Sequence, residues 1–334
     1  MCLKEVPHVS VWVRGMVRVE AAASVEFTEE WKNWKLHHGK TYESEKTEEE
    51  RKAIWLANKL YIDEHNANAF ELGYTLSMNA FGDLTAEEFI DIYLTSNQRN
   101  NHTKRRGKIF KAHRRFKYPA SVDWRTRGAV NTVKNQGQCS ASYAFAAVAV
   151  LEGINSLAND QMISLSEQNI IDCSVPFGNR GCNGGDVYSA LNYIIDNGGV
   201  DTENSYGFKE KQSICAYTSK NSGASATGVV EIQSGNEYDL QAAVASVGPV
   251  AVSVDANTYA FRFYQKGVFR STACSSYDLN HSMVVVGYGV YNGKDYWLCK
   301  NSWGSNWGIN GYILMARNRY NLCGIASEAL YPTL

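Results

Sequence analysis

The chain has 334 residues, with 33 basic and 34 acidic side chains, a net charge of -1 and an isoelectric point near 6.7. This balance gives no electrostatic reason to expect a nucleic-acid partner, and no apolar run reaches the roughly 18 residues that a membrane-spanning helix needs. A protein of this length can bury a large core, so we expect one globular unit with an appended segment, or two lobes.

Residues 1–24 form a poor signal-like leader. Arg14 and Arg18 interrupt the apolar stretch that precedes the small residues Ala21–Ala23, where a signal peptidase would cut. The cysteines described below indicate an oxidising compartment. We give them more weight than the poor match of the leader to a signal peptide. We therefore predict a secretory route.

Residues 25–98 are charged and amphipathic. Apolar and aromatic side chains recur there at steps of three and four residues, which places them on one face of a helix. The members of this stripe are Ile54, Trp55, Ala57, Asn58, Tyr61, Ile62 and His65. A stripe of this kind has to pack against another part of the chain.

Residues 99–117 are basic and loop-like. They contain Lys104–Arg106 and the pair Arg114 and Arg115, which are typical of a solvated linker and also of a junction accessible to proteases. We place a maturation cleavage close to Lys117–Tyr118. Asn101–Thr103 matches the glycosylation sequon N-x-[ST].

Residues 118–334 are rich in glycine and tyrosine. Residues 142–158 are nearly apolar all round and predict a buried helix with Ser142 in its first turn, and residues 185–196 predict a second helix. Later segments predict strands at 250–254, 296–298 and 311–315. A further strand is predicted to begin at Ser282 and to end at turns at Gly287 and Gly289. A helical lobe followed by a β lobe is expected.

Eight cysteines occur, and none belongs to the paired C-x-x-C arrangement of zinc or thiol redox sites. Disulfides that close loops are the preferred interpretation, and six cysteines allow fifteen pairings. Cys299 lies in an apolar run and is expected to be a buried thiol, whereas Cys2 would be lost with the leader. We predict neither a metal nor a cofactor.

Ser142, His281 and Asn301 are the candidate catalytic residues. His281 is expected to accept the Ser142 proton as general base, and Asn301 to hold the other imidazole nitrogen and fix the tautomer. The Gln136 side-chain amide and the Ser142 N–H would form an oxyanion hole, and Trp303 would shield the His281–Asn301 contact from water. Taken singly, Ser142 would be a helix N-cap, His281 a structural histidine and Asn301 part of a turn.

These residues carry a resemblance to the papain-like cysteine peptidases. The segment Gln136–Phe145 reproduces the active-site segment of that family with an oxygen in place of the sulfur, and Ser142, His281 and Asn301 follow the order of its Cys, His and Asn. Residues 25–98 resemble its inhibitory propeptide, whose motifs fall on Arg51, Trp55, Asn58, Ile62, Asn66 and Asn79–Asp83. The resemblance implies an α+β, two-lobe fold with a helical left lobe and a β-barrel right lobe, preceded by a helical propeptide.

Within that family the chain resembles the cathepsin L-like silicateins. Ser142 together with Tyr143 carries this likeness, while Ser140 departs from the usual glycine and Tyr277–Asp278 from a more serine-rich stretch. The resemblance implies the bridges Cys139–Cys182, Cys173–Cys215 and Cys274–Cys323. It also implies a substrate cleft of Gly184, Gly185, Asp186, Val187, Ala256, Leu279 and Glu328, in which the glycines let a substrate backbone approach.

Three hypotheses for the function follow. The first is a matured, secreted enzyme that condenses silicic acid or silicon alkoxides into silica, with its own propeptide and silica as partners. The second is a structural protein that assembles into filaments and templates mineral through surface hydroxyls. The third is weak peptide or ester hydrolysis by a serine version of the papain site, which Ser142→Cys would raise.

Overall fold

The structure is a computed structural model that describes residues 27–95, 107–113 and 117–334. The leader, Cys2, the sequon at Asn101 and the basic residues of 104–106 and 114–115 lie outside the described residues. No helix within the described ranges is both long and apolar enough to cross a membrane.

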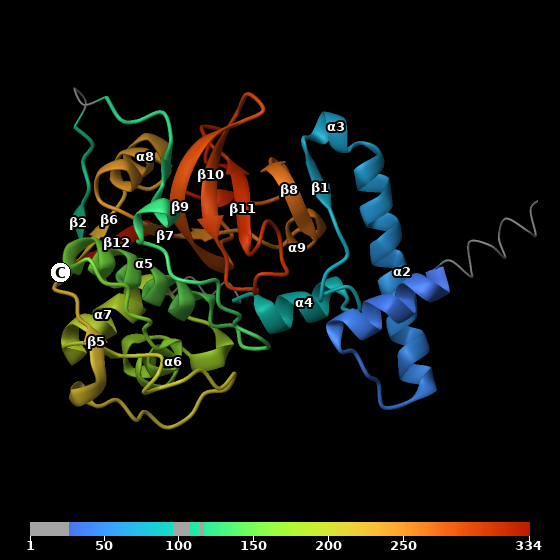
Figure 1. The fold of residues 1–334 in the computed structure, drawn as a ribbon, viewed down its shortest axis with the longest axis horizontal. Coiled ribbons are helices and arrows are strands. Elements are labelled where there is room, and N and C mark those ends of the chain that lie inside the picture. The colour runs from blue at the N-terminus through green and yellow to red at the C-terminus, as the bar shows by residue number, and fades with distance from the viewer. Residues whose placement is uncertain (1–26, 96–106, 114–116) are drawn as a thin grey trace, which may run out of the picture.

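Residues 118–334 form a helical part and a β part, so the predicted α+β class is confirmed (Figure 1). The helices are α5 (Ser142–Asn159), α6 (Glu167–Cys173), α7 (Val187–Asn197), α8 (Glu237–Ser246) and α9 (Tyr259–Arg262). The strands of this part are β3 (Val122–Asp123), β4 (Val200–Asp201), β5 (Ser222–Ala224), β6 (Gly228–Glu231), β7 (Val250–Val254), β8 (Tyr264–Phe269), β9 (His281–Tyr291), β10 (Lys294–Lys300), β11 (Tyr312–Ala316) and β12 (Ala329–Thr333).

The main sheet has ten strands in the order β1-β8-β11-β10-β9-β7-β12-β6-β2, with β3 beside β9. Its first and last strands, β1 (Tyr74–Leu76) and β2 (Lys108–Ile109), come from the segment before residue 118. β4 and β5 form a separate two-stranded sheet. Helix α5 packs on the centre of the main sheet, against β9, and this contact brings the first turn of α5 to the start of that strand.

The turns predicted at Gly287 and Gly289 are wrong, because β9 continues through both glycines to Tyr291. A Cβ at Gly287 would lie 2.2 Å from the Val122 carbonyl oxygen of the neighbouring strand β3. At Gly289 it would lie 2.8 Å from the Tyr296 hydroxyl. The two glycines therefore allow close packing inside a strand, because glycine in a sheet can mark a place where another backbone or side chain approaches closely.

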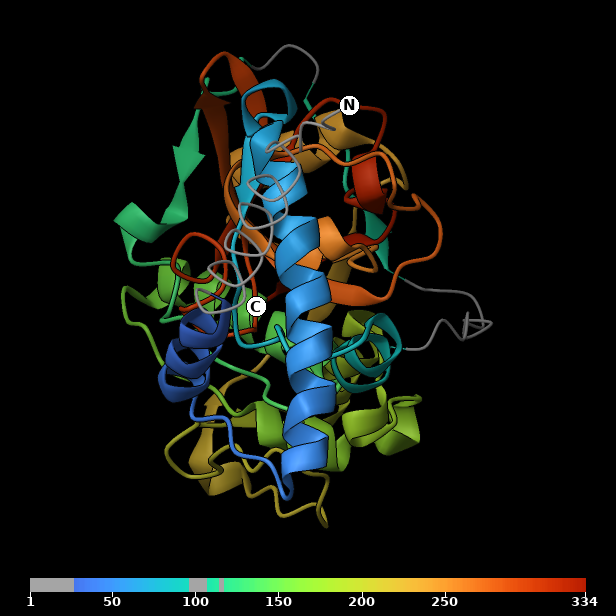
Figure 2. The same cartoon turned by 90° about the vertical axis from the view of Figure 1, so that its right-hand side faces the viewer.

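The segment before residue 95 is a set of crossing helices rather than one helix. Residues 27–38 are helical, and α2 (Glu45–Ala67), α3 (Ala69–Leu72) and α4 (Ala86–Tyr93) follow. Trp55, Asn58 and Ile62 of the predicted stripe are buried, whereas Ala57 and Tyr61 are exposed. Figure 2 shows α2 as the long helix that crosses in front of the rest of the chain. Trp31, Trp34 and Trp55 form a small aromatic core of their own.

We call residues 27–95 the prosegment, and it docks on the β part through backbone groups. β1 pairs antiparallel with β8. The guanidinium of Arg262, which is 2% exposed, donates to the carbonyl oxygens of Phe81, Leu84 (2.6 Å) and Thr85 (3.1 Å). Burial lowers the pKa of Arg262 to about 10, so the side chain stays charged at neutral pH. One cation of the segment after residue 118 thus holds the chain reversal that precedes α4.

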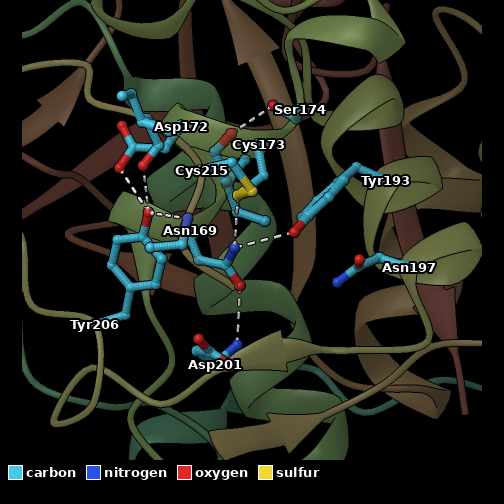
Figure 3. The surroundings of a disulfide bond; sticks show 12 residues. Asn169, Asp172, Cys173, Ser174, Tyr193, Asn197, Asp201, Tyr206 and Cys215 are labelled. Atoms are coloured by element: carbon cyan, nitrogen blue, oxygen red, sulfur yellow. Dashed lines mark hydrogen bonds between the residues drawn. A yellow bond between two sulfur atoms is a disulfide. The ribbon is translucent and has the colours of Figure 1, made fainter. Parts of the chain in front are cut away.

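All three implied disulfides are confirmed: Cys139–Cys182, Cys173–Cys215 and Cys274–Cys323. Around the Cys173–Cys215 bridge, the Tyr206 hydroxyl donates to Asp172 (2.8 Å) and the Asn169 amide donates to the Tyr193 hydroxyl (3.0 Å), as Figure 3 shows. Cys299 is a buried free thiol, as predicted. Cys139–Cys182 and Cys173–Cys215 fix loops of the helical part, and Cys274–Cys323 joins two loops of the β part.

Replacing Arg262 by Met will destabilise the full-length chain by about 3 kcal/mol, because three buried or partly buried carbonyl groups of the prosegment lose a charged donor. Arg262→Lys is the matched control, since it keeps the charge but loses the planar array of donors, and it will recover only part of the loss. Urea unfolding of the three proteins at pH 7 gives the comparison. Equal midpoints for wild type and Arg262→Met would contradict this anchoring role.

Candidate active site

Ser142 is the first residue of α5 and not its N-cap. The N-cap is Ala141, which makes no side-chain capping bond, so the capping interpretation of Ser142 is wrong. Ser142 is 1% exposed, and its Oγ accepts a hydrogen bond from the backbone N–H of Ser282 at 3.2 Å. Because Ser282 follows His281 at the start of β9, this bond joins the helical part to the β part at the candidate nucleophile.

His281 and Asn301 are brought together by neighbouring strands. His281 opens β9 and Asn301 directly follows β10, which pairs with β9. The Asn301 Oδ1 lies 2.7 Å from His281 Nε2 and also accepts from the Ser302 backbone N–H at 2.8 Å. The Asn301 side-chain atom that faces His281 accepts from a backbone N–H, so it is the carbonyl oxygen and not the amide nitrogen. Because this oxygen can only accept, His281 Nε2 must be the donor and carries the imidazole proton. Nδ1 is left with its lone pair, and it has no hydrogen-bond partner among the described residues.

The imidazole is held neutral by its surroundings. Burial lowers the pKa of His281 to about 4, and the hydrogen bond to Asn301 offsets only part of this effect. The Trp303 ring lies 4.5 Å from the His281 ring, and Trp303 is 5% exposed. A neutral histidine with a free Nδ1 has the protonation state that a general base requires. Ser142 and His281 make no hydrogen bond to each other in the described structure, in which the prosegment is in place.

Gln136 is close to the site, but its amide is engaged. Its Oε1 accepts from the Ser302 hydroxyl (2.7 Å), and its Nε2 donates to the carbonyl oxygens of Cys139 (2.9 Å) and Tyr93 (3.3 Å). Tyr93 belongs to the prosegment. A prosegment carbonyl therefore occupies one donor of the group that we predicted for the oxyanion hole.

Residues 92–95 of the prosegment cross between the helical part and the β part. On one side, the Ser140 hydroxyl lies 3.0 Å from the Ile92 carbonyl oxygen and 2.9 Å from that of Leu94. On the other side, the Thr95 N–H donates to the Asn280 carbonyl at 2.8 Å. This role of Ser140 was missed from the sequence, where the only signal was a hydroxyl at a position usually held by glycine.

The remaining predicted cleft residues fall in different places. Gly184 has a φ of +98°, and a Cβ there would lie 2.5 Å from the Thr95 side chain, so it faces the prosegment. Asp186 caps α7 by accepting from the Ser189 N–H (2.9 Å), and Val187 is buried. At Gly185 a Cβ would meet Asn179 and the Tyr143 ring.

Leu279 and Glu328 line one pocket of about 560 Å³ on the β part, while Ala256 is fully buried. Five of the lining residues carry hydroxyls: Ser234, Ser276, Tyr277, Tyr320 and Ser327. The structure therefore divides the predicted cleft into a glycine-lined part against the prosegment and a hydroxyl-lined pocket.

Tyr143 supports the loop that carries Gly184. Its side chain is fully buried, and its hydroxyl donates to the Gly181 carbonyl at 3.1 Å. Burial raises the pKa of Tyr143, so the phenol stays protonated. Tyr143 therefore acts on the loop beside Cys182 and not on the imidazole.

A buried cluster of charges behind the site had no sequence signal. Lys134 Nζ lies 2.8 Å from Glu167 and 3.4 Å from Glu152, and both carboxylates are almost fully buried. A cavity of about 20 Å³ separates this cluster from Lys300 and Asn301. Burial raises the pKa of Glu167 and lowers that of Lys300. These residues lie far apart in the sequence, so no local motif marks them.

Comparison with known proteins identifies the family to which this chain is similar. Residues 118–333 match the family model described as papain family cysteine protease, and residues 31–89 match that of the cathepsin propeptide inhibitor domain. Among curated proteins, a silicatein of Petrosia ficiformis is 47% identical and covers 93% of this chain and 96% of its own. Procathepsin L of Mus musculus is 44% identical, with 92% of each chain covered.

Solved structures give the same result. Digestive procathepsin L 3 of the Tenebrio molitor larval midgut superposes with a TM-score of 0.85 at 42% identity, over 92% of this chain and 99% of its own. Procathepsin L2 proteinase from the same tissue reaches 0.88 at 37% identity, over 92% and 100%. These likenesses confirm a papain-like fold preceded by a helical propeptide.

Acid will destabilise the full-length chain through His281. Its pKa of about 4 in the folded chain lies below the ordinary 6.5, so the unfolded chain binds the proton first and stability rises with pH between these values. As the pH falls from 6.5 to 4, up to about 3 kcal/mol is lost. Urea midpoints at pH 7, 5.5 and 4 will show a steeper decline for wild type than for His281→Gln. Parallel declines would contradict this assignment.

Ser140→Ala will loosen the prosegment locally without unfolding it. The variant loses the hydroxyl that bridges the Ile92 and Leu94 carbonyls, which corresponds to about 1.5 kcal/mol and roughly a tenfold faster local opening. Hydrogen exchange of the Thr95 amide measures this change, with the amides of α2 as the internal control. An unchanged rate at Thr95 would exclude Ser140 as an anchor.

Proposed function

The chain belongs to the papain family of cysteine proteases, and from this membership and the serine at its nucleophile position we propose that the matured protein condenses silicic acid or silicon alkoxides into silica. The observation that carries the proposal is a neutral, Asn301-oriented His281 beside Ser142. A cysteine works well as a thiolate paired with an imidazolium, whereas a serine needs a neutral base to take its proton. The 47% identity to a silicatein supports silicon as the substrate element.

The proposed reaction has two balanced steps. Ser142 Oγ forms a bond to silicon while His281 Nδ1 accepts the hydroxyl proton and passes it to the departing oxygen, which leaves as water from silicic acid or as an alcohol from an alkoxide. A second silanol then attacks the silicon of the serine silyl ether. An Si–O–Si bond forms, and Ser142 regains its proton through His281. No oxidant or reductant is needed.

Negative charge on the silicon-bound oxygens would be stabilised at the start of α5. The Ser142 N–H lies at a helix N-terminus without a side-chain cap, and removal of the prosegment frees the Gln136 amide from Tyr93. A donor of this kind contributes about 3 kcal/mol in comparable sites. The proposal requires the Ser142 side chain to leave the Ser282 N–H and to turn its Oγ toward His281 Nδ1.

Maturation is part of the proposal. We assign residues 1–24 to a leader, 25–98 to an inhibitory propeptide, 99–117 to the region of cleavage and 118–334 to the mature domain. The three disulfides favour passage through a secretory compartment. Because the prosegment contacts Gln136, Ser140 and Gly184, the site opens only after its removal.

A second candidate function is weak peptide or ester hydrolysis. It is favoured by Gly184, which faces the Thr95 side chain of the prosegment as it would face a peptide, and by the 44% identity to a procathepsin L. In that reaction, Ser142 would form an acyl ester and water would release the acid.

Substitution of the site separates these functions. The matured Ser142→Ala and His281→Ala variants will form silica from a silicon alkoxide at least about 100-fold more slowly than wild type, because general-base catalysis contributes on that scale. Ser121→Ala, at an exposed serine outside the site, is the control. Unchanged rates for both site variants would exclude catalysis by Ser142 and His281, and silica would then be deposited through the surface hydroxyls of the protein. If Ser142→Cys restores strong peptide cleavage and loses silica formation, the cleft is intact and the serine directs the reaction to silicon.

A further inference from the structure

The hydroxyl-lined pocket on the β part has the size of a small-molecule site. Its volume is about 560 Å³, and Tyr277 and Tyr320 are among the residues that line it. Pockets of roughly 300–1,000 Å³ hold drug-sized molecules, and a short oligosaccharide is of that size. No described residue of the prosegment lines this pocket. It is therefore accessible in the full-length chain, before any maturation.

The two most exposed tyrosines of the described residues both lie at this pocket. Tyr320 is 98% exposed and Tyr277 is 80% exposed. Rings as exposed as these bury almost no apolar area within the chain, so they contribute little to its folding. Each ring nevertheless has an apolar face, on which a ligand with an apolar face of its own can pack. The two rings are thus available to a ligand.

Tyr320 also has a backbone conformation that suits glycine better than tyrosine. Its φ of +56° lies in the left-handed region, and Asn321 follows with a φ of +57°. That region is unfavourable for a bulky side chain, and such strained residues cluster at functional sites. Because the exposed ring gains no burial that would offset the strain, folding alone does not explain a tyrosine at this position.

The loops that carry the two rings are held in place from below. The buried carboxylate of Glu237 accepts from the backbone N–H groups on both sides of Tyr320, at 3.2 and 2.9 Å. The Cys274–Cys323 bridge joins this loop to the loop that carries Tyr277. A fixed arrangement of this kind lowers the entropy that is lost when a ligand binds.

The polar groups of the pocket wall are mainly hydrogen-bond acceptors. The Ser276 hydroxyl donates to the Asn321 carbonyl at 3.0 Å, and the Ser327 hydroxyl donates to the Ser276 carbonyl at 2.8 Å. Their protons are used, but each hydroxyl oxygen keeps a lone pair that can accept from a ligand. Glu328 adds a carboxylate, and none of the described lining residues is basic. This wall fits a ligand with many hydroxyl donors and repels an anion.

We propose that this pocket binds a neutral oligosaccharide. The apolar C–H face of a sugar ring packs on the rings of Tyr277 and Tyr320, and the hydroxyl groups at its rim donate to Ser276, Ser327 and Glu328. A small polyol without an apolar face, such as silicic acid, would not use the tyrosine rings.

The saccharide site is distinct from the candidate active site. Neither Ser142 nor His281 lines the pocket, although Leu279, close to His281 in the chain, does. A glycan held here would fix the protein to a carbohydrate-bearing surface beside the candidate active site. The inference does not depend on the proposed function, because binding needs neither maturation nor catalysis.

The experiment titrates the full-length chain at neutral pH with three neutral trisaccharides: cellotriose, laminaritriose and maltotriose. Calorimetry measures the affinity, and saturation-transfer NMR identifies the sugar protons that contact the protein. We expect at least one trisaccharide to bind with a Kd of about 1 mM or tighter, with the strongest transfer to ring C–H protons. If none of the three binds at concentrations up to about 10 mM, the inference is wrong.

Substitutions of the tyrosines locate the site. Tyr320→Ala and Tyr277→Ala will each weaken binding about tenfold, because each removes one stacking face. Tyr320→Phe keeps the ring and will retain most of the affinity. Tyr291→Ala, at a tyrosine that is 45% exposed and lies outside the pocket, is the matched control. Wild-type affinity in both alanine variants would exclude the pocket as the saccharide site.

Tyr320→Gly separates binding from folding. Glycine accepts the left-handed conformation without strain, so this variant will keep the urea midpoint of the wild type while it binds as weakly as Tyr320→Ala. A lowered midpoint would show that the Tyr320 side chain serves the fold, and it would contradict the role assigned to this ring.

A charged ligand tests the chemical class. A sulfated form of the trisaccharide that binds will bind more weakly than the neutral form, and Glu328→Gln will narrow the difference because it removes the repelling carboxylate. Tighter binding of the sulfated form to the wild type would contradict a neutral saccharide as the ligand.

Discussion

The hydrogen bond between His281 Nε2 and Asn301 Oδ1 is the contact on which the site depends. It exists because β9 and β10 pair in a fixed register, so that the first residue of one strand meets the residue after the other. The bond fixes the imidazole tautomer and leaves Nδ1 as the acceptor on the side of Ser142. Burial beneath Trp303 then keeps the ring neutral. A shift of one residue in that ladder would turn His281 to the other face and remove the proposed base from the site.

The prosegment blocks the site mainly with its own backbone. Carbonyls of Ile92, Tyr93 and Leu94 accept from Ser140 and Gln136, and the carbonyls held by Arg262 fix the chain just before α4. Prosegment side chains add to this backbone recognition: Phe81 and Phe89 contact Trp303, and the Asn79 amide donates to the Arg262 carbonyl at 2.8 Å. In the proposed function, the same donors would become available to substrate oxygens once the prosegment is removed.

The sequence predicted those features that a local pattern or a family motif carries. It identified the buried helix at Ser142, the strand at 250–254, the three disulfides and the buried Cys299. It failed where tertiary packing decides: Gly287 and Gly289 resemble turn residues but lie in a strand because β3 and Tyr296 approach so closely. The Lys134–Glu167 cluster and the contacts of Ser140 join segments 33 to 48 residues apart, and no local pattern reports such pairs.

The exchange of sulfur for oxygen at position 142 is consistent with the electrostatics of the described state. A thiolate would favour a protonated His281, and a protonated ring buried next to Trp303 with only the neutral Asn301 as partner would be poorly stabilised. A serine hydroxyl places no charge there before reaction, so the neutral ring and the neutral nucleophile are compatible at rest. Charge then develops only during attack, when the helix N-terminus and Gln136 can offset it. The same scaffold therefore accommodates an oxygen nucleophile without a new charged partner for the imidazole.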